Sequence, residues 1–387
     1  IIEKCALKIS IFDFGFILYF LTLFIDDLAL DNITVGIKGI RYVAYMLFVI
    51  HIVSTNRIKN RQLLYFLIAF SGGIGISLLT HDVYWAIAAL MVLAVRKIDP
   101  VHIVKLSYCI LLIATMITVL MALAGLIPMS VNIHRRAGET IVRYGMGFYH
   151  SNVLPLIVFY LMIYRMLIYG RKIKIAEIVL WNCLSIVVYN ICYSRNGLYA
   201  ILLCGVLYSL YIRLTKKKTS VSYKKILKFF AKYSIYICIV FSMLMTAIQG
   251  MGLNSIWQIN KFFTGRFAIA YHQIEESGIY LINILSKEEY KLVARVLDNG
   301  YLFVVLRYGI LFLLFYIIMQ RNILKKYPFD TIIHIVMICV VITNMIDNDF
   351  YSYGFLPIIV LAFSDYTLKY KNSQKGQIDA MMEMQYA

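Results

Sequence analysis

The segment from Arg143 to Pro155 holds the densest set of residues that could do chemistry. It reads RYGMGFYHSNVLP, and its two glycines allow a tight turn, a close approach of the backbone, or both. Ser151 can cap a helix that starts here, with Pro155 in the first turn, where a missing N–H is harmless. Arg143, His150 and Asn152 would then lie at a helix N-terminus, which suits anions. His150 could act as a base, as a hydrogen-bond donor, or only as a structural residue.

Other arginines are expected on the same side of the molecule. Arg195 lies in the sequence SRNG, which opens a later helix, and Arg266 follows Thr-Gly at the start of a helix in a long loop. Guanidinium groups that converge on an outer cavity would bind phosphate or pyrophosphate, because arginine contacts these groups bidentately. The alternative is that some of them contact lipid phosphates. The further candidates for substrate binding are Arg135, Arg136, Glu139, Asn152, Asn196, Arg295, Asp298, Asn299, Arg307, Asp347 and Asp349.

Metal and nucleotide motifs are not indicated. Asp347-Asn348-Asp349 resembles the DxD of many glycosyltransferases, but nucleotide sugars are cytoplasmic, and this segment is expected outside. Binding of sugar hydroxyls or capping of a helix end is therefore favoured over metal binding. The seven cysteines form no CxxC pair. The sequence contains no P-loop, GxSxG or HExxH motif, so we expect no cofactor and an already activated substrate.

The elements that would position these residues are membrane helices. Of the 387 residues, 61% are hydrophobic and only 15% are charged, and the mean hydropathy is +0.78. Soluble domains are about 45–50% apolar. The net charge of +18 comes from short Lys and Arg clusters between apolar runs, as in cytoplasmic loops, so nucleic acid is not an expected partner. We predict an all-α, polytopic membrane protein with about 12 transmembrane helices in one domain over residues 1–387.

The charge pattern also predicts the topology. Basic clusters such as Lys216–Lys228 alternate with short acidic loops, which indicates that both termini are cytoplasmic. Two large outer loops are expected at about 128–150 and 250–299, and the second is expected to contain helices of its own, one of them capped at Ser286. One continuous span is predicted at 300–319. The polar tail 371–387 is expected to be disordered.

Four short motifs resemble a known family. RYGMGFYHSN is similar to the Arg…Gly-Phe-Gly-His-x-Asn stretch of Wzy-type polysaccharide repeat-unit polymerases, which are related to O-antigen ligases. YSRNG resembles their Ser-Arg-[Thr/Asn]-Gly, FTGR their Gly-Arg, and LDNGYL their Asp-Asn-x-Tyr-Leu. The motifs occur in the family's order over roughly residues 135–365. In this chain Tyr149 precedes the histidine where glycine is usual, and Ser151 stands where proline is common.

The resemblance implies a GT-C-like fold and an enzyme on the outer face of the bacterial cytoplasmic membrane. Such an enzyme moves a growing chain from undecaprenyl pyrophosphate onto a hydroxyl of the next lipid-linked oligosaccharide, and makes capsule, exopolysaccharide or O-antigen. Arg143, Arg195 and Arg266 would hold pyrophosphate, since a departing diphosphate needs neutralisation of its charge. His150 would be a base or would orient the hydroxyl, with Glu139, Asp298 or Glu275 as substitutes. A flippase and a chain-length regulator would be the protein partners.

Two alternatives share part of this evidence. An O-antigen ligase-type glycan transferase would have the same loop, arginines and histidine. A flippase for the lipid-linked oligosaccharide would instead show a repeat of helices and helices broken at the membrane midplane. The sequence shows neither an internal repeat nor helices broken at the midplane, and the long outer loop 250–299 is not expected of a flippase.

Overall fold

The computed structural model describes residues 10–30, 34–55, 70–78, 84–136, 139–214, 220–251, 265–284, 297–348 and 353–368. In the first half of the chain lie α1 (Ile11–Asp26), α2 (Thr34–Thr55), α4 (Tyr84–Ala94), α5 (Pro100–Leu123), strands β1 (Val131–Arg136) and β2 (Glu139–Tyr144), and α6 (Val153–Tyr169). After α6 follow α7 (Ile175–Cys192), α8 (Arg195–Leu214), α9 (Ser220–Gly250), α11 (Arg266–Ser277), α13 (Gly300–Tyr308), α14 (Ile310–Lys326), α15 (Thr331–Ile346) and α16 (Phe355–Phe363).

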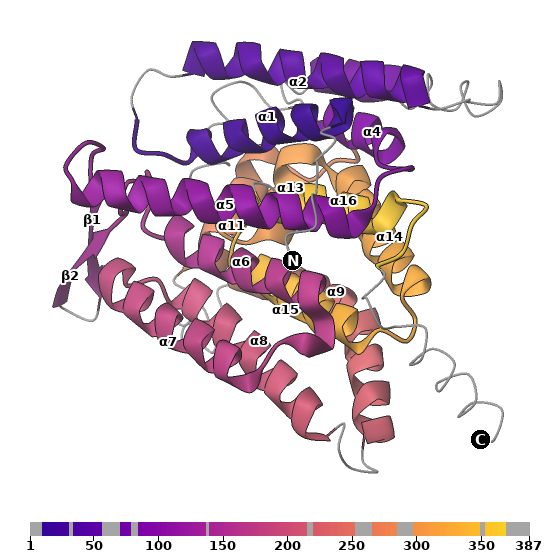
Figure 1. Ribbon diagram of the computed structural model, residues 1–387. Helices are drawn as coiled ribbons and strands as arrows, with labels where there is room; N and C mark the ends of the chain where they lie inside the picture. The colour runs from indigo at the N-terminus through magenta and orange to yellow at the C-terminus, as the bar shows by residue number, and fades with distance from the viewer. Residues whose placement is uncertain are drawn as a thin grey trace.

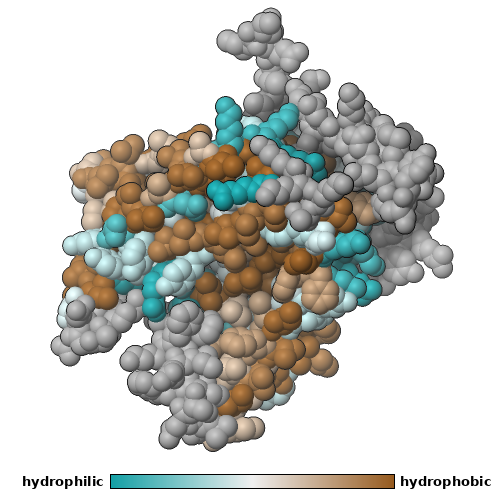
Figure 2. Space-filling model, turned by 90° about the horizontal axis from the view of Figure 1, so that it is seen from below, coloured by the Kyte–Doolittle hydropathy of each residue, from teal (hydrophilic) through white to brown (hydrophobic). Residues whose placement is uncertain are grey.

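The helices form a layered bundle. In Figure 1, α2 covers α1 on one side, α7 and α8 lie on the opposite side, and α5 and α6 run between them. The strands stand at one end of the bundle. Figure 2 shows a face that is mostly hydrophobic, with hydrophilic residues in separate patches. An apolar surface of this kind is suited to lipid contact.

Six of the described helices are long and apolar enough to cross a membrane. They are Gly36–Thr55, Pro100–Leu123, Val153–Lys172, Ile175–Cys192, Arg195–Leu214 and Val221–Gly250, and Trp85–Ala94 and Thr331–Ile346 are shorter apolar helices. The predicted helical membrane protein is thereby confirmed, whereas the count of about 12 spans stays a prediction. The α6 span is 83% buried inside the protein, against 22–39% for the other five.

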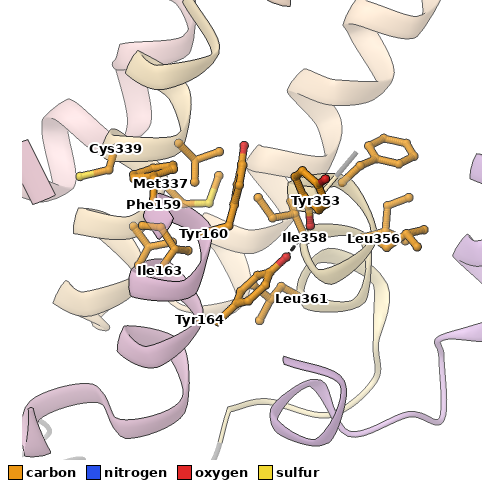
Figure 3. Packing of buried hydrophobic residues seen from close by; sticks show 14 of the residues in the cluster. Phe159, Tyr160, Ile163, Tyr164, Met337, Cys339, Tyr353, Leu356, Ile358 and Leu361 are labelled. Carbon is orange, nitrogen blue, oxygen red and sulfur yellow. Dashed lines mark hydrogen bonds between the residues drawn. The ribbon is translucent and has the colours of Figure 1, made fainter. Parts of the chain in front are cut away.

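Apart from Arg165, which pairs with Glu177 of α7, α6 carries no charged residue, so it can lie at the centre of the bundle. Its residues Phe159 and Ile163 belong to the same buried cluster as Met337 of α15 (Figure 3). On the side facing α16, the Tyr164 hydroxyl donates a hydrogen bond to the Tyr353 carbonyl (Figure 3). The helix that begins at the candidate site is therefore fixed along its length by packing.

The bundle has two distinct ends, as the charge pattern predicted. At one end Lys326 Nζ, at the end of α14, donates to the Ser364 carbonyl at 2.5 Å, beyond the end of α16. Ser364 Oγ in turn donates to the Ile98 carbonyl at 2.6 Å, just before α5. These segments belong to the basic set of loops. At the other end a β-bridge joins Leu28 to Phe148, so two loops expected outside lie together.

The predicted outer loop 128–150 contains a β-hairpin, so the all-α prediction was wrong here. β1 and β2 pair antiparallel, with Asn132 opposite Arg143 and Arg136 opposite Glu139. The first four residues of VNIHRR alternate between apolar and polar, which is the period of a strand, and ETIVRY has three β-branched residues in a row. In the other outer loop α11 confirms a helix, while the helix expected at Ser286 and the tail 371–387 lie outside the described residues.

The continuous span predicted at 300–319 is also wrong. The chain breaks at Gly309, which has φ 94°, between α13 and α14. The rings of Tyr301 and Tyr316 lie 6.2 Å apart, although a continuous helix would separate them by roughly 22 Å. The two helices therefore fold back on each other.

A segment from the outer loop stabilises this reversal. The N–H groups of Ile310 and Leu311 donate to the carbonyls of Tyr280 and Leu281 at 3.0 and 3.1 Å. A Cβ at Gly309 would lie 2.4 Å from the Leu281 carbonyl oxygen. The outer segment thus supplies the acceptors that a continuous helix would have provided.

Candidate functional site

The two glycines of the RYGMGFYHSN segment form a tight turn. Met146 and Gly147 have φ 52° and 91°, and the Phe148 N–H donates to the Gly145 carbonyl at 3.0 Å. A Cβ at Gly145 would lie 2.0 Å from Ser130 Oγ, and one at Gly147 would lie 2.8 Å from the Thr118 side chain of α5. Both expected reasons for glycine, the turn and the close approach, therefore apply.

This turn is held against the end of α1. The Tyr149 N–H donates to the Asp27 carbonyl at 3.0 Å, and the Ala29 N–H donates to the Gly147 carbonyl at 2.9 Å. The chain leaving the turn is thereby placed at the start of α6.

The predicted Ser151 cap of α6 is wrong. The N-cap residue is Asn152, and its own side chain makes no capping bond. Instead, His150 Nδ1 accepts the Asn152 N–H at 3.2 Å. Ser151 is fully buried, and its hydroxyl has no hydrogen-bond partner among the described residues. Nδ1 of His150 takes the place of the expected serine oxygen as acceptor, because the ring reaches forward over the start of the helix, as a capping side chain does.

Arg143 is aimed at the same helix end by the hairpin. Its strand partner Asn132 accepts the Ser151 N–H through Oδ1 at 3.5 Å, a marginal contact. Directly opposite residues of a hairpin project to the same face. The Arg143 guanidinium donates through Nη2 to Asn152 Oδ1 and through Nε to the Cys192 carbonyl at 3.0 Å. Arg143 thus joins the start of α6 to the end of α7.

The start of α8 lies against the start of α6. A Cβ at Gly197 would come within 2.5 Å of the Pro155 side chain, so only glycine permits this approach. Arg195 and Asn196, the first two residues of α8, are half-buried. Asn196 Nδ2 donates to Asp347 Oδ2 at 3.0 Å and to the Ile346 carbonyl at 3.1 Å. This bond connects α8 to the end of α15.

A second pair of helix starts lies beside Asp347. Asn348 Nδ2 donates to the Leu297 carbonyl at 2.7 Å. The next residue, Asp298, binds Arg266 at the start of α11, with Nη2 and Oδ2 3.2 Å apart. The Arg266 side chain is only 9% exposed, and its Nε has no hydrogen-bond partner among the described residues.

Asn299 is the N-cap of α13. Its Oδ1 accepts the N–H groups of Tyr301 and Leu302, each at 3.1 Å. Its Nδ2 donates to Ser242 Oγ of α9 at 2.9 Å. Asn299, a candidate for substrate binding, is buried, and its contacts are those of a helix cap.

The three arginines predicted to act together thus lie on elements joined by hydrogen bonds. Arg143 contacts the end of α7, which Arg195 follows. Asn196, next to Arg195, binds Asp347, and Asn348 binds the carbonyl of Leu297, whose neighbour Asp298 pairs with Arg266. The helix starts of α6, α8, α11 and α13 therefore gather at one end of the bundle, where their N–H groups favour anions.

Several predicted site residues are not joined to this group. Arg307 lies at the far end of α13, with its guanidinium 5.0 and 5.3 Å from the Phe303 and Tyr308 ring centres. Glu275 lies on the exposed side of α11 and accepts the Tyr271 hydroxyl.

The backbones of Arg135, Arg136 and Glu139 lie at the tip of the hairpin, away from its Asn132–Arg143 pair. Arg295 and Asp349 lie outside the described residues.

Sequence reasoning missed the role of Asp27, which it took as part of an acidic loop. The Asp27 carboxylate accepts the Tyr353 hydroxyl and is buried just beyond α1. Burial raises the pKa of Asp27 to about 7 from its ordinary 3.8, against the lowering effect of the Tyr353 hydrogen bond. Its neighbour Asp26 instead pairs with Arg41 of α2. The sequence signal that could have indicated this role is the pair of adjacent acidic residues at the end of an apolar run.

Among the described residues no group of three or more His, Cys, Asp or Glu side chains could hold a metal ion. Comparison of the chain with protein-family models, with curated proteins and with solved structures found no match. The resemblance to the polymerases therefore remains a prediction from the four motifs.

Proposed function

We propose that this protein polymerises undecaprenyl-pyrophosphate-linked oligosaccharide repeat units on the outer face of the bacterial cytoplasmic membrane. It would be a glycosyltransferase of surface polysaccharide synthesis, with a GT-C-like fold. The observation that carries the proposal is that Arg143 contacts the start of α6, while Arg195 and Arg266 open α8 and α11, at one end of an apolar bundle. A diphosphate attached to a membrane lipid is the anion that this position suits.

The reaction exchanges one bond for another at the anomeric carbon. A hydroxyl oxygen of the incoming repeat unit bonds to the anomeric carbon at the reducing end of the growing chain. The bond from that carbon to the pyrophosphate oxygen breaks, and its electron pair leaves with undecaprenyl pyrophosphate. The hydroxyl loses its proton. Negative charge therefore grows on the leaving group, and fixed cations stabilise it most effectively.

The site is organised for such a charge before any substrate binds. Arg143 is held by the Asn152 side chain and the Cys192 carbonyl, and Arg266 by Asp298. Donors held in place need little reorganisation during the reaction, which is the main requirement for electrostatic catalysis. The remaining half-buried residues of the site, such as Arg195 and Asn196, would contact sugar or phosphate groups.

One observation favours a flippase as a second candidate. The span expected at 300–319 is broken at Gly309, and transporters use broken helices at their binding sites. An O-antigen ligase-type transferase fits the same arginines and is the nearer alternative. The flippase and the polymerase predict different phenotypes, so one experiment separates them.

The experiment is deletion of the gene, followed by gel analysis of the surface glycan. Loss of a polymerase leaves single repeat units on the surface in place of a ladder. Loss of a flippase leaves no surface glycan, with lipid-linked units retained inside. Loss of a ligase leaves long chains that stay on the lipid. Only the first result supports the proposal.

The arginines are tested by complementing the deletion. Arg143→Ala and Arg266→Ala are expected to lose the ladder at wild-type membrane levels. Arg96→Ala is the matched control, because Arg96 lies at the opposite end of the bundle, is 40% exposed and meets Asp365 only at 3.9 Å. Wild-type polymer length in either site variant would contradict the assignment. Co-purification of a flippase or chain-length regulator with the tagged protein would test the expected partners.

A further inference from the structure

The ring of His150 has its two nitrogens in different chemical states. Nδ1 accepts the Asn152 N–H at 3.2 Å, so Nδ1 carries a lone pair and no proton. In the neutral imidazole the proton is then on Nε2. The hydrogen bond that caps α6 therefore also selects the tautomer of the histidine.

Resting on the proposed function, we infer that His150 serves the reaction as a neutral hydrogen-bond donor through Nε2–H, and that it is not the base that deprotonates the acceptor hydroxyl. Its ligand is an oxygen of the departing pyrophosphate. The Arg143 guanidinium donates to the Asn152 side chain, and His150 Nδ1 accepts the Asn152 N–H, so both side chains contact the N-cap residue of α6. Together with the α6 N-terminus they form one donor set for a growing negative charge.

The geometry disfavours the role of base at either nitrogen. Protonation at Nδ1 would turn an N–H toward the Asn152 N–H and would remove the capping bond. Nε2 could take a proton only from the tautomer that carries its proton on Nδ1, which has the same conflict. Arg143, which holds the Asn152 side chain, already places one positive charge at this helix start, and an imidazolium would add a second.

The proton of the acceptor hydroxyl can be transferred without the histidine. The acceptor oxygen forms its bond to the anomeric carbon, and the carbon–oxygen bond to the pyrophosphate breaks. The hydroxyl proton passes to an oxygen of the leaving pyrophosphate, which has gained the electron pair. His150 keeps its Nε2 proton throughout and shares it only as a hydrogen bond.

Two substitutions of His150 separate hydrogen-bond donation at Nε2 from hydrogen-bond acceptance at Nδ1. His150→Gln places an amide N–H near the position of Nε2, and cannot accept a proton at neutral pH. His150→Asn places Oδ1 at the position of Nδ1, where it can still accept the Asn152 N–H, but supplies no donor at the distance of Nε2. The pair therefore separates donation from capping of α6.

The test measures joining of lipid-linked repeat units extracted from the deletion strain, by membranes that contain equal amounts of each variant. His150→Gln is expected to stay within about tenfold of the wild-type rate, and His150→Asn to lose about 100-fold or more, as for loss of one donor to a developing anion. A rate for His150→Gln as low as that of His150→Asn, or a rate for His150→Asn near wild type, would overturn the inference.

A second measurement reads the tautomer directly. In protein labelled with 15N in its histidine rings, the signals that disappear in His150→Gln belong to His150. They are expected to show an unprotonated Nδ1 and a protonated Nε2, and the opposite assignment would overturn the inference. Wild-type membranes that join no units would reject the proposed function itself. Wild-type activity together with an inactive His150→Gln would reject only the inference.

Discussion

Asn196 at the start of α8 donates a hydrogen bond to the Asp347 carboxylate at the end of α15, across 151 residues of sequence, at 3.0 Å. Both residues were candidates for the site from the sequence alone. The bond connects the start of α8 to Asp347. The next residue, Asn348, binds Leu297, which precedes the Asp298 partner of Arg266. The residues next to Arg195 and next to Asp298 are therefore both bonded to the Asp347–Asn348 segment.

Exchange of the two side chains tests this bond. Asn196→Asp places two carboxylates together and should reduce polymer length and lower the free energy of unfolding by about 1–3 kcal/mol. Asp347→Asn preserves an amide–amide bond and should be milder. The double variant Asn196→Asp with Asp347→Asn restores a donor and an acceptor, so its thermal midpoint should recover most of the loss. Additive effects of the two changes would show that the bond does not couple the sites.

Gly147 is expected to tolerate no side chain. Gly147→Ala would strain a residue at φ 91° and press its Cβ to 2.8 Å from Thr118, so both activity and thermal midpoint should fall. Gly125→Ala is the control, because Gly125 has φ 74° with nothing within 4 Å of an added Cβ. The strain alone costs roughly 1–2 kcal/mol. Equal losses in the two variants would mean that contact with α5 does not matter.

The buried Asp27 should make stability depend on pH. Its pKa is raised in the folded protein to about 7 from 3.8, so the folded state holds the proton between these values while the unfolded chain has lost it. The stabilising effect is complete below 3.8 and is lost as the pH rises through 7. Between pH 5 and 7 the free energy of unfolding should fall by about 1.4 kcal/mol per pH unit.

The matched variant for this measurement is Asp27→Asn, whose amide oxygen can still accept the Tyr353 hydroxyl. Its thermal midpoint should be less sensitive to pH than that of the wild type. Asp365→Asn, at a side chain that is 60% exposed, should keep the wild-type pH dependence. A wild-type slope in Asp27→Asn would assign the dependence to other groups.

Gly309 should be needed for the reversal between α13 and α14. Gly309→Ala adds a Cβ 2.4 Å from the Leu281 carbonyl at a positive φ, and is expected to lower the amount of folded protein in the membrane. Gly265→Ala also has a positive φ, 80°, but meets nothing within 4 Å, and should be milder. Protein levels in membranes and thermal midpoints in detergent would measure the difference. A Gly309→Ala variant as stable as Gly265→Ala would argue that the two helices can rearrange.

The sequence indicated the membrane helices and the chemical groups more clearly than it indicated the turns. Long apolar runs report burial in lipid directly, so the helical membrane character of the chain was predicted correctly. The hairpin was missed because strands of six residues give little signal beside helices of 20. The break at Gly309 was missed because one glycine in an apolar run is also tolerated within a helix.

Contacts made across long stretches of sequence could not be predicted. The burial of Asp27 depends on Tyr353, which lies 326 residues away. The capping role of His150 was hidden because serine at position 151 is the better cap by type. The hairpin decides otherwise, since Asn132 and Arg143 fix how residues 151–152 meet the start of α6.

The pairing of Asn132 with Arg143 makes the direction of the Arg143 side chain depend on whether an even or an odd number of residues is inserted into its strand. Successive residues of a strand point to opposite faces, so one residue inserted between Arg143 and Gly145 would turn the guanidinium away from α6, and a second insertion would turn it back. Residues added beyond the Arg136–Glu139 pair change neither the pairing below it nor the direction of Arg143. The tip is therefore where this protein can lengthen or shorten while its arginine stays in place.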